Sequence, residues 1–216
     1  MKVIGINGSP RKHYNTYKLC EKVLEGAEKS GAETELINLY DYNFKGCVSC
    51  FACHLKKRND QYVCSYKDEL KEILEKCVNA DAIVIGTPIY YGSITGETQS
   101  FLERLLFAAD TYYINEKGER VSKLKKQIKT LMIYTMNVPK EMDYFNGEDQ
   151  LKIMRDYITN IIGPCEAFYA YDTCQFKNYD LYLNNMFDPK HKKERLEEQF
   201  PQECEKAYQI GEKLLD

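Results

Sequence analysis

Short apolar runs alternate along the chain with longer segments in which apolar residues recur every three or four positions, the spacing of a helix with one buried face. The run at 82–86, Ala-Ile-Val-Ile-Gly, is continuous and rich in β-branched residues, which is typical of a strand buried on both faces. The expected strands are Lys2–Asn7, Thr34–Leu39, Ala82–Gly86, Thr130–Thr135 and Glu166–Tyr171. The expected helices cover 15–30, 67–79, a segment that includes 101–109, 149–162, a charged and solvated stretch at 189–199, and a last helix from Pro201.

Strands and helices that alternate five times indicate an α/β fold with helices on both faces of a parallel sheet. The pattern favours a flavodoxin-like three-layer sandwich with a five-stranded parallel sheet in the order 2-1-3-4-5. In that order, the loops after strands one and three flank the crevice where ligands bind. Residues 1–172 are expected to form this domain, and 173–216 a C-terminal helical extension packed on the same domain.

The loop after the first strand has the features of an anion site. Gly8 ends the strand and a helix begins near Asn15, so backbone N–H groups and the helix dipole would face the loop. Ser9, Arg11, Asn15 and Thr16 add donors or charge. The chain lacks Gly-x-Gly-x-x-Gly and the P-loop pattern at this position, which favours a terminal phosphomonoester such as that of FMN. An ordinary strand–turn–helix with polar caps is the alternative.

The loop that follows strand 82–86 could bind a flat ring. Pro88 stiffens its start, and Gly92 would allow close backbone approach to a ligand. Tyr90 or Tyr91 could stack on an isoalloxazine ring, whose edge the backbone amides and carbonyls could bind. The alternative is a tight turn with a serine cap.

A cysteine cluster lies between the second expected strand and the helix at 67–79. Cys47, Cys50 and Cys53 are spaced by two residues each, and Cys64 could supply a fourth ligand to a [4Fe-4S] cluster. Ten residues separate Cys53 from Cys64. Zinc, bound by the four cysteines or with His54 in place of one, and free thiols are the alternatives, so no metal site is firm.

Charge and hydropathy restrict the partners. A net charge of −3 gives no basic surface for nucleic acid. No apolar stretch is long enough to cross a bilayer, and the first residues run directly into a strand rather than a signal peptide, so we expect no membrane partner and a cytoplasmic location.

Three motifs occur together in one order: Gly8-Ser9-Pro10-Arg11 with Asn15-Thr16, then Gly46-Cys47-x-x-Cys50-Phe51-x-Cys53, then Gly86-Thr87-Pro88-Ile89-Tyr90 with Gly92-Ser93. Together they resemble the flavodoxin-like NADPH-dependent FMN reductase family, in particular its iron–sulfur flavoprotein branch. Phe101-Leu102-Glu103-Arg104 is also similar, with Glu103 where that family usually has Asp.

The resemblance implies non-covalent FMN with its phosphate on Ser9, Arg11, Asn15 and Thr16. The residues implied to line the ring are Pro88, Ile89, Tyr90, Tyr91, Gly92 and Ser93, with the strand end at 134–137, including Thr135, also near it. It implies no catalytic side chain, because the flavin does the chemistry.

The predicted function is an NAD(P)H-dependent FMN oxidoreductase that passes electrons to an unidentified small-molecule or protein acceptor. One alternative is an iron–sulfur flavoprotein that carries electrons between proteins through a [4Fe-4S] cluster on Cys47–Cys64. Another is an FMN-binding sensor without turnover. A homodimer or higher homo-oligomer is expected from the resemblance, with Thr111–Lys126 as a candidate interface.

Overall fold

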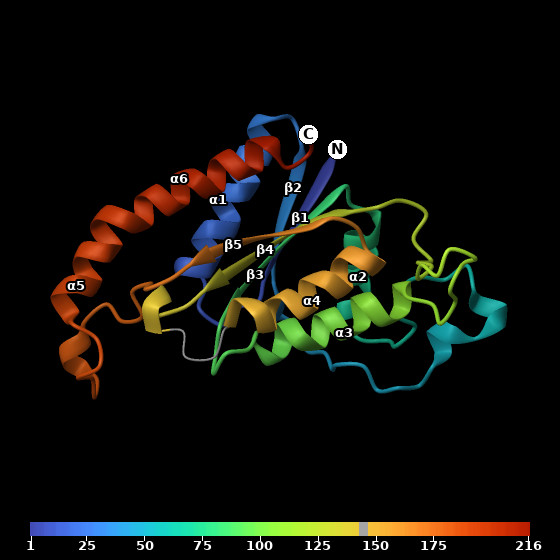
Figure 1. Cartoon of the computed structure of the whole chain (residues 1–216), viewed down its shortest axis with the longest axis horizontal. Helices are drawn as coiled ribbons and strands as arrows, with labels where there is room; N and C mark the ends of the chain where they lie inside the picture. Colours follow the sequence, from blue (N-terminus) through green and yellow to red (C-terminus); the bar gives the residue numbers. More distant parts are fainter. Residues whose placement is uncertain (143–146) are drawn as a thin grey trace.

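A parallel sheet of five strands in the order β2-β1-β3-β4-β5 forms the centre of the molecule (Figure 1). This computed structural model describes residues 1–142 and 147–216. The strands are β1 Lys2–Asn7, β2 Glu33–Asn38, β3 Ala82–Pro88, β4 Lys129–Thr135 and β5 Cys165–Ala170. All neighbouring pairs are parallel. The structure therefore confirms the predicted flavodoxin-like strand order.

Helices cover both faces of the sheet and complete the three layers. They are α1 Asn15–Lys29, α2 Leu70–Asn79, α3 Gly96–Ala109, α4 Gly147–Ile161, α5 Pro189–Glu194 and α6 Phe200–Lys213. Figure 1 shows α1 and α6 on one face and α2, α3 and α4 on the other. A π-helical turn, Arg195–Gln199, joins α5 to α6.

Alternate residues of each inner strand pack into different cores. Val3 of β1 and Val84 of β3 pack with α1, whereas Ile4 and Ile85 pack against α2 and α3. All four are fully buried. Because both faces are covered, the inner strands are apolar at successive positions, which is why the sequence pattern predicts them so well.

α1 and α6 approach so closely that backbone meets backbone. A Cβ atom added at Gly26 would lie 2.1 Å from the Tyr208 carbonyl oxygen, and one added at Gly211 would lie 2.0 Å from the Val23 carbonyl oxygen. No side chain can occupy either position without moving the helices apart. The contact fixes the last helix of the chain against the first.

Two helical predictions need correction. α2 begins at Leu70 rather than Lys67, and the Asp68 carboxylate just before it accepts a hydrogen bond from Arg104, at 2.5 Å. The stretch 189–199 was expected to be solvated along its length, but Lys192 and Arg195 are buried. Residues 143–146 of the loop expected at 137–147 lie outside the described residues.

Within the described residues, no helix combines the length and the apolar character that crossing a bilayer requires.

We expect Gly211→Ala to lower the stability of the fold, because its methyl group would overlap the backbone of α1. Overpacking of this kind costs about 1–3 kcal/mol in the free energy of unfolding. Denaturant unfolding followed by circular dichroism measures it. Gly96→Ala is the matched control, since a Cβ there has no neighbour within 4 Å. Equal unfolding midpoints for the two variants would contradict the close α1–α6 contact.

Candidate functional site

The loop after β1 is fixed by hydrogen bonds from its own strand and from its neighbours. The buried Asn7 amide accepts from the Ser9 N–H, at 3.2 Å, and donates to Asn38 of β2, at 2.9 Å. The Gly8 N–H donates to the Gly86 carbonyl at 2.8 Å, and the Thr95 hydroxyl donates to the Gly8 carbonyl at 2.8 Å. The ends of β1, β2 and β3 therefore hold the loop in one conformation.

The first turn of α1 faces the space that this loop encloses. The N-cap residue is Tyr14, whose side chain makes no capping hydrogen bond in the described part of the chain. The first N–H groups of a helix have no partner within the helix, and the dipole favours an anion there. Thr16 is buried, and its hydroxyl lies 2.8 Å from that of Thr135 at the end of β4.

A cleft of about 150 Å³ opens at the carboxyl ends of β1, β3, β4 and β5. Its lining residues are Ser9, Arg11, Tyr14, Asn15, Thr16, Pro88, Ile89, Tyr90, Thr135, Met136, Asn137, Thr173 and Gln175. Ten of these were expected near the cofactor from the sequence: seven in the two motif loops, and Thr135, Met136 and Asn137 at the end of β4. Tyr91, Gly92 and Ser93 are not among the lining residues.

Those three residues belong to a tight turn beside the cleft. The backbone groups of Tyr90 and Ser93 bond to each other in both directions, at 2.8 and 3.0 Å. Tyr91 and Gly92 between them have φ of 51° and 78°. A left-handed conformation is costly for a tyrosine, and such strain gathers at functional sites. The Tyr91 side chain is fully exposed and does not line the cleft.

The sequence interpretation missed three lining residues: Tyr14, Thr173 and Gln175. The Arg11 guanidinium lies 3.5 Å from the centre of the Tyr14 ring, and it donates to the Gln175 carbonyl at 2.6 Å. Residues 173–175 directly follow β5, and the carboxyl ends of parallel strands share one edge. That rule of the fold was the signal that could have placed them at the site.

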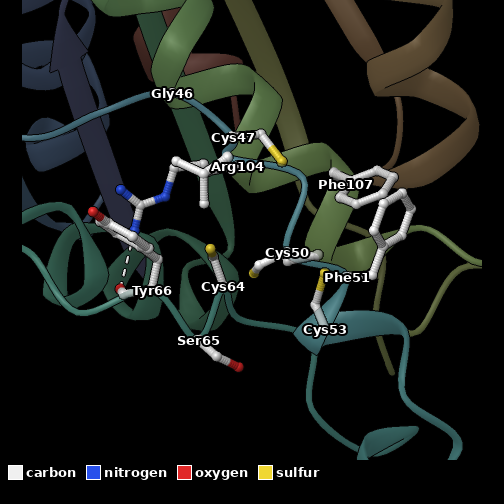
Figure 2. Close-up of a pocket in the computed structure, with 12 residues that line it drawn as sticks. Gly46, Cys47, Cys50, Phe51, Cys53, Cys64, Ser65, Tyr66, Arg104 and Phe107 are labelled. Atoms are coloured by element: carbon white, nitrogen blue, oxygen red, sulfur yellow. Dashed lines mark hydrogen bonds between the residues drawn. The ribbon is translucent and has the colours of Figure 1, made fainter.

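A second pocket contains the cysteine cluster. Figure 2 shows Cys47, Cys50 and Cys53 on the loop before α2 and Cys64 on the other side of the pocket, with their sulfur atoms directed into it. All four cysteines are free thiols in the structure. In the described ranges, no three His, Cys, Asp or Glu side chains lie close enough together to bind a single metal ion. The four cysteines therefore line one pocket but do not converge on the position of a single metal ion.

Two charged residues of α3 hold the cysteine loop. The Cys47 N–H donates to the Glu103 carboxylate at 3.1 Å. Arg104, which is buried, donates to the Lys45 carbonyl at 3.1 Å and to the Tyr66 carbonyl at 3.2 Å, and it pairs with Asp68. Glu103, at the position where the resemblance leads one to expect Asp, thus contacts the loop directly.

Burial and nearby cations act together on this pocket. Burial raises the pKa of the Cys53 thiol, and the Lys123 ammonium partly offsets this. Burial lowers the pKa of Arg104, but hydrogen bonds to Asp68 and to Cys64 outweigh it and raise that pKa above its ordinary value.

Other cysteines lie far from this chemistry. Cys20 and Cys77 are fully buried in the two cores, and burial raises the pKa of Cys20 to about 12. A thiol so difficult to ionise is inert at neutral pH.

Comparisons with known proteins place this site in a family. Residues 1–123 match the family described as NADPH-dependent FMN reductase. An iron-sulfur flavoprotein from Archaeoglobus fulgidus is 46% identical over 104 residues, which are 48% of this chain and 48% of that protein. An NAD(P)H-dependent FAD/FMN reductase from Geobacillus thermodenitrificans is 31% identical over 105 residues, 48% of this chain and 50% of that protein. The chain thus matches about half the length of these curated relatives.

Solved structures resemble the fold over the whole chain. An NAD(P)H:quinone oxidoreductase from Methanothermobacter marburgensis has a TM-score of 0.67 at 15% identity, with 100% of this chain and 98% of that chain covered. An FMN-dependent NADH-azoreductase from Bacillus anthracis, solved in complex with FMN, has a TM-score of 0.65 at 18% identity, with 100% and 99% covered. Since the family model matches 123 of the 216 residues, the chain belongs to the NADPH-dependent FMN reductase family.

Proposed function

We propose that the protein is an FMN-dependent oxidoreductase that uses NAD(P)H and binds FMN in the cleft at the carboxyl ends of β1, β3, β4 and β5. One observation carries the proposal. The first turn of α1, without a side-chain cap from Tyr14, faces a cleft that is lined by hydroxyl, amide and guanidinium groups. Such an arrangement favours a bound anion at the helix start.

The chemistry of the cleft suits a phosphomonoester. Ser9, Asn15 and Thr16 offer neutral donors and Arg11 a positive charge. Among the described residues that line the cleft, none is acidic. A phosphate there would accept hydrogen bonds from backbone and side chains and would meet no opposing carboxylate.

The loop at 88–93 would support the flavin ring at the open side. Pro88 and Ile89 line the cleft, and the half-exposed Tyr90 stands at its rim. FMN, when bound, supplies the redox chemistry, which is acceptance of a hydride from NAD(P)H and transfer of electrons to an acceptor. The chain's residues bind and orient; we assign no side chain as acid, base or nucleophile. The acceptor would approach from the solvent side of Tyr90 and Tyr91.

The cellular location and the oligomeric state are also part of the proposal. We infer a cytoplasmic homo-oligomer with the segment Thr111–Lys126 at the interface. Tyr112, Tyr113 and Ile114 in this segment are well exposed, as an apolar surface that meets a partner subunit would be.

The cysteine pocket favours a second candidate function, an iron–sulfur flavoprotein with a [4Fe-4S] cluster on Cys47, Cys50, Cys53 and Cys64. In such a cluster each thiolate binds a different iron, and these four cysteines line one pocket with their sulfur atoms directed into it. Ser49 and Phe51 in the loop have positive φ, and turns of this kind direct backbone N–H groups toward anionic centres. The buried Arg104 would offset part of the negative charge.

Reduction of the bound flavin separates an enzyme from a sensor. We expect the FMN-loaded protein to lose its visible flavin absorption when NADPH or NADH is added without air, because hydride transfer to the flavin abolishes those bands. Stopped-flow absorbance measures the rate, with free FMN as the control for uncatalysed reduction. Bound FMN that neither nucleotide reduces would support the sensor instead.

Arg11→Met should weaken FMN binding about tenfold, because hydrogen bonds to a charged group contribute roughly 1.5–3 kcal/mol. Riboflavin, which has no phosphate, should bind the variant and the wild type about equally. Quenching of flavin fluorescence gives both dissociation constants. Lys12→Met is the matched control, because Lys12 pairs with Asp41 at 2.6 Å, outside the lining of the cleft. Equal losses for FMN and riboflavin would argue against a phosphate site at Arg11.

Protein purified without air is expected to contain about four iron and four acid-labile sulfide per chain if the second candidate is correct. Cys64→Ser should lower both contents together with the broad visible absorption. Cys204→Ser, at a half-buried position on α6, should leave them unchanged. Wild-type protein with flavin bands and no iron would leave an FMN reductase with free thiols.

A further inference from the structure

Residues 172–175, shortly after the end of β5, form one side of the cleft. We call them the post-β5 segment. It continues the pairing with the chain after β4. The Asp172 N–H donates to the Val138 carbonyl at 2.9 Å, and the Thr173 N–H donates to the Met136 carbonyl at 2.9 Å. The Thr173 hydroxyl donates to the same Met136 carbonyl at 3.1 Å. These hydrogen bonds hold the post-β5 segment beside the chain that follows β4.

Carbonyl groups of the post-β5 segment orient donors of the first loop. The Cys174 carbonyl accepts from the Asn15 amide at 2.9 Å. The Gln175 carbonyl accepts from Arg11 at 2.6 Å and from the Tyr14 hydroxyl at 3.3 Å. Arg11 and Asn15 are long or flexible side chains, and each retains further N–H donors when one is bound in this way. The segment thus fixes the direction in which their remaining donors point.

Lys192 on α5 fastens this segment to the end of β4. Its side chain is 1% exposed, and its ammonium group donates to the Asn137 carbonyl at 2.5 Å and to the Asp172 carboxylate. Asp172 also pairs with His191 at 2.5 Å. The Asn137 amide in turn donates to the Gln175 side chain at 3.0 Å. The Lys192 ammonium therefore links the chain after β4, at Asn137, to the post-β5 segment, at Asp172.

Arg195, one turn further along, adds a second attachment. It donates to the Tyr171 carbonyl at 2.8 Å and pairs with Glu203 of α6 at 2.5 Å. Burial raises the pKa of Asp172, but hydrogen bonds from Lys192 and His191 outweigh it and keep that pKa below its ordinary value. Removal of a lysine or arginine from water is costly, and an apolar side chain could fill the same volume at less cost. Breaking one of these buried pairs would leave its partner charge unpaired, so both attachments act on the position of the chain that follows β5.

We propose that Lys192 is a positioning residue for the flavin phosphate, and that the C-terminal extension, residues 173–216, completes the cofactor site. Through Asp172 and Asn137, Lys192 holds the post-β5 segment where its carbonyl groups orient Arg11 and Asn15. The inference rests on the proposed FMN function. It goes beyond it, because these residues lie outside the 123 that match the family model.

Flavin titrations of Lys192→Met test the proposal. We expect the dissociation constant of FMN to rise about tenfold, as for the loss of a hydrogen bond to a charged group, and that of riboflavin to change by less than about twofold. A purely structural role would weaken both flavins alike. Lys190→Met is the matched control on the same helix, since Lys190 is exposed and its ammonium lies 3.8 Å from Glu194. It should bind FMN as the wild type does.

A second variant keeps the proposal testable if Lys192→Met does not fold. Asp172→Asn combined with Lys192→Met removes both buried charges while the amide can still bond to His191, and it should show the same selective loss of FMN. Either variant, folded and with wild-type FMN affinity, would overturn the proposal. If neither folds, amide hydrogen exchange of the wild type decides: FMN, and not riboflavin, should slow exchange at 172–175 and in α5, and equal exchange would overturn it. Wild type that binds neither flavin would defeat the proposed function itself.

Discussion

Backbone N–H groups at the start of α1 need acceptors, and the arrangement of the cleft follows from that need. The strand before the helix ends at Asn7, whose amide fixes the loop, and Tyr14 makes no side-chain capping bond in the described part of the chain. A helix start of this kind, held rigidly at the switch point of a parallel sheet, has a strong preference for an anion. The polar side chains that line the cleft around it carry hydroxyl, amide or guanidinium groups.

α3 connects the two sites. Its N-cap residue, Thr95, accepts a hydrogen bond from the Thr98 N–H and donates one to the Gly8 carbonyl. The helix therefore begins in contact with the loop that follows β1. Its later turns carry Glu103 and Arg104, which hold the cysteine loop. A helix rises about 1.5 Å per residue, so Arg104 lies about 13 Å along the helix axis from Thr95. The cleft and the cysteine pocket therefore have a constant mutual position.

The sequence could predict what depends on local pattern. Buried strands are apolar throughout, and the loops after β1 and β3 carry their polar residues within a few positions of the strand ends. The contacts of Lys192 could not be predicted in this way, because its partners Asn137 and Asp172 lie 55 and 20 residues away. In a run of lysines and glutamates, a buried cation has the same pattern as a solvated one. The pairing of Asp68 with Arg104, 36 residues away, depends in the same way on the fold rather than on local pattern.

The glycine contact between α1 and α6 has a mechanical consequence. Where side chains separate two helices, a change of rotamer can absorb a small shift of one of them. At Gly26 and Gly211 the backbones are in direct contact, so no side chain lies between them that could absorb a shift. A displacement of α6 therefore moves α1 as well, and with it the helix start that faces the cleft. The last helix and the first turn of α1 are therefore mechanically coupled.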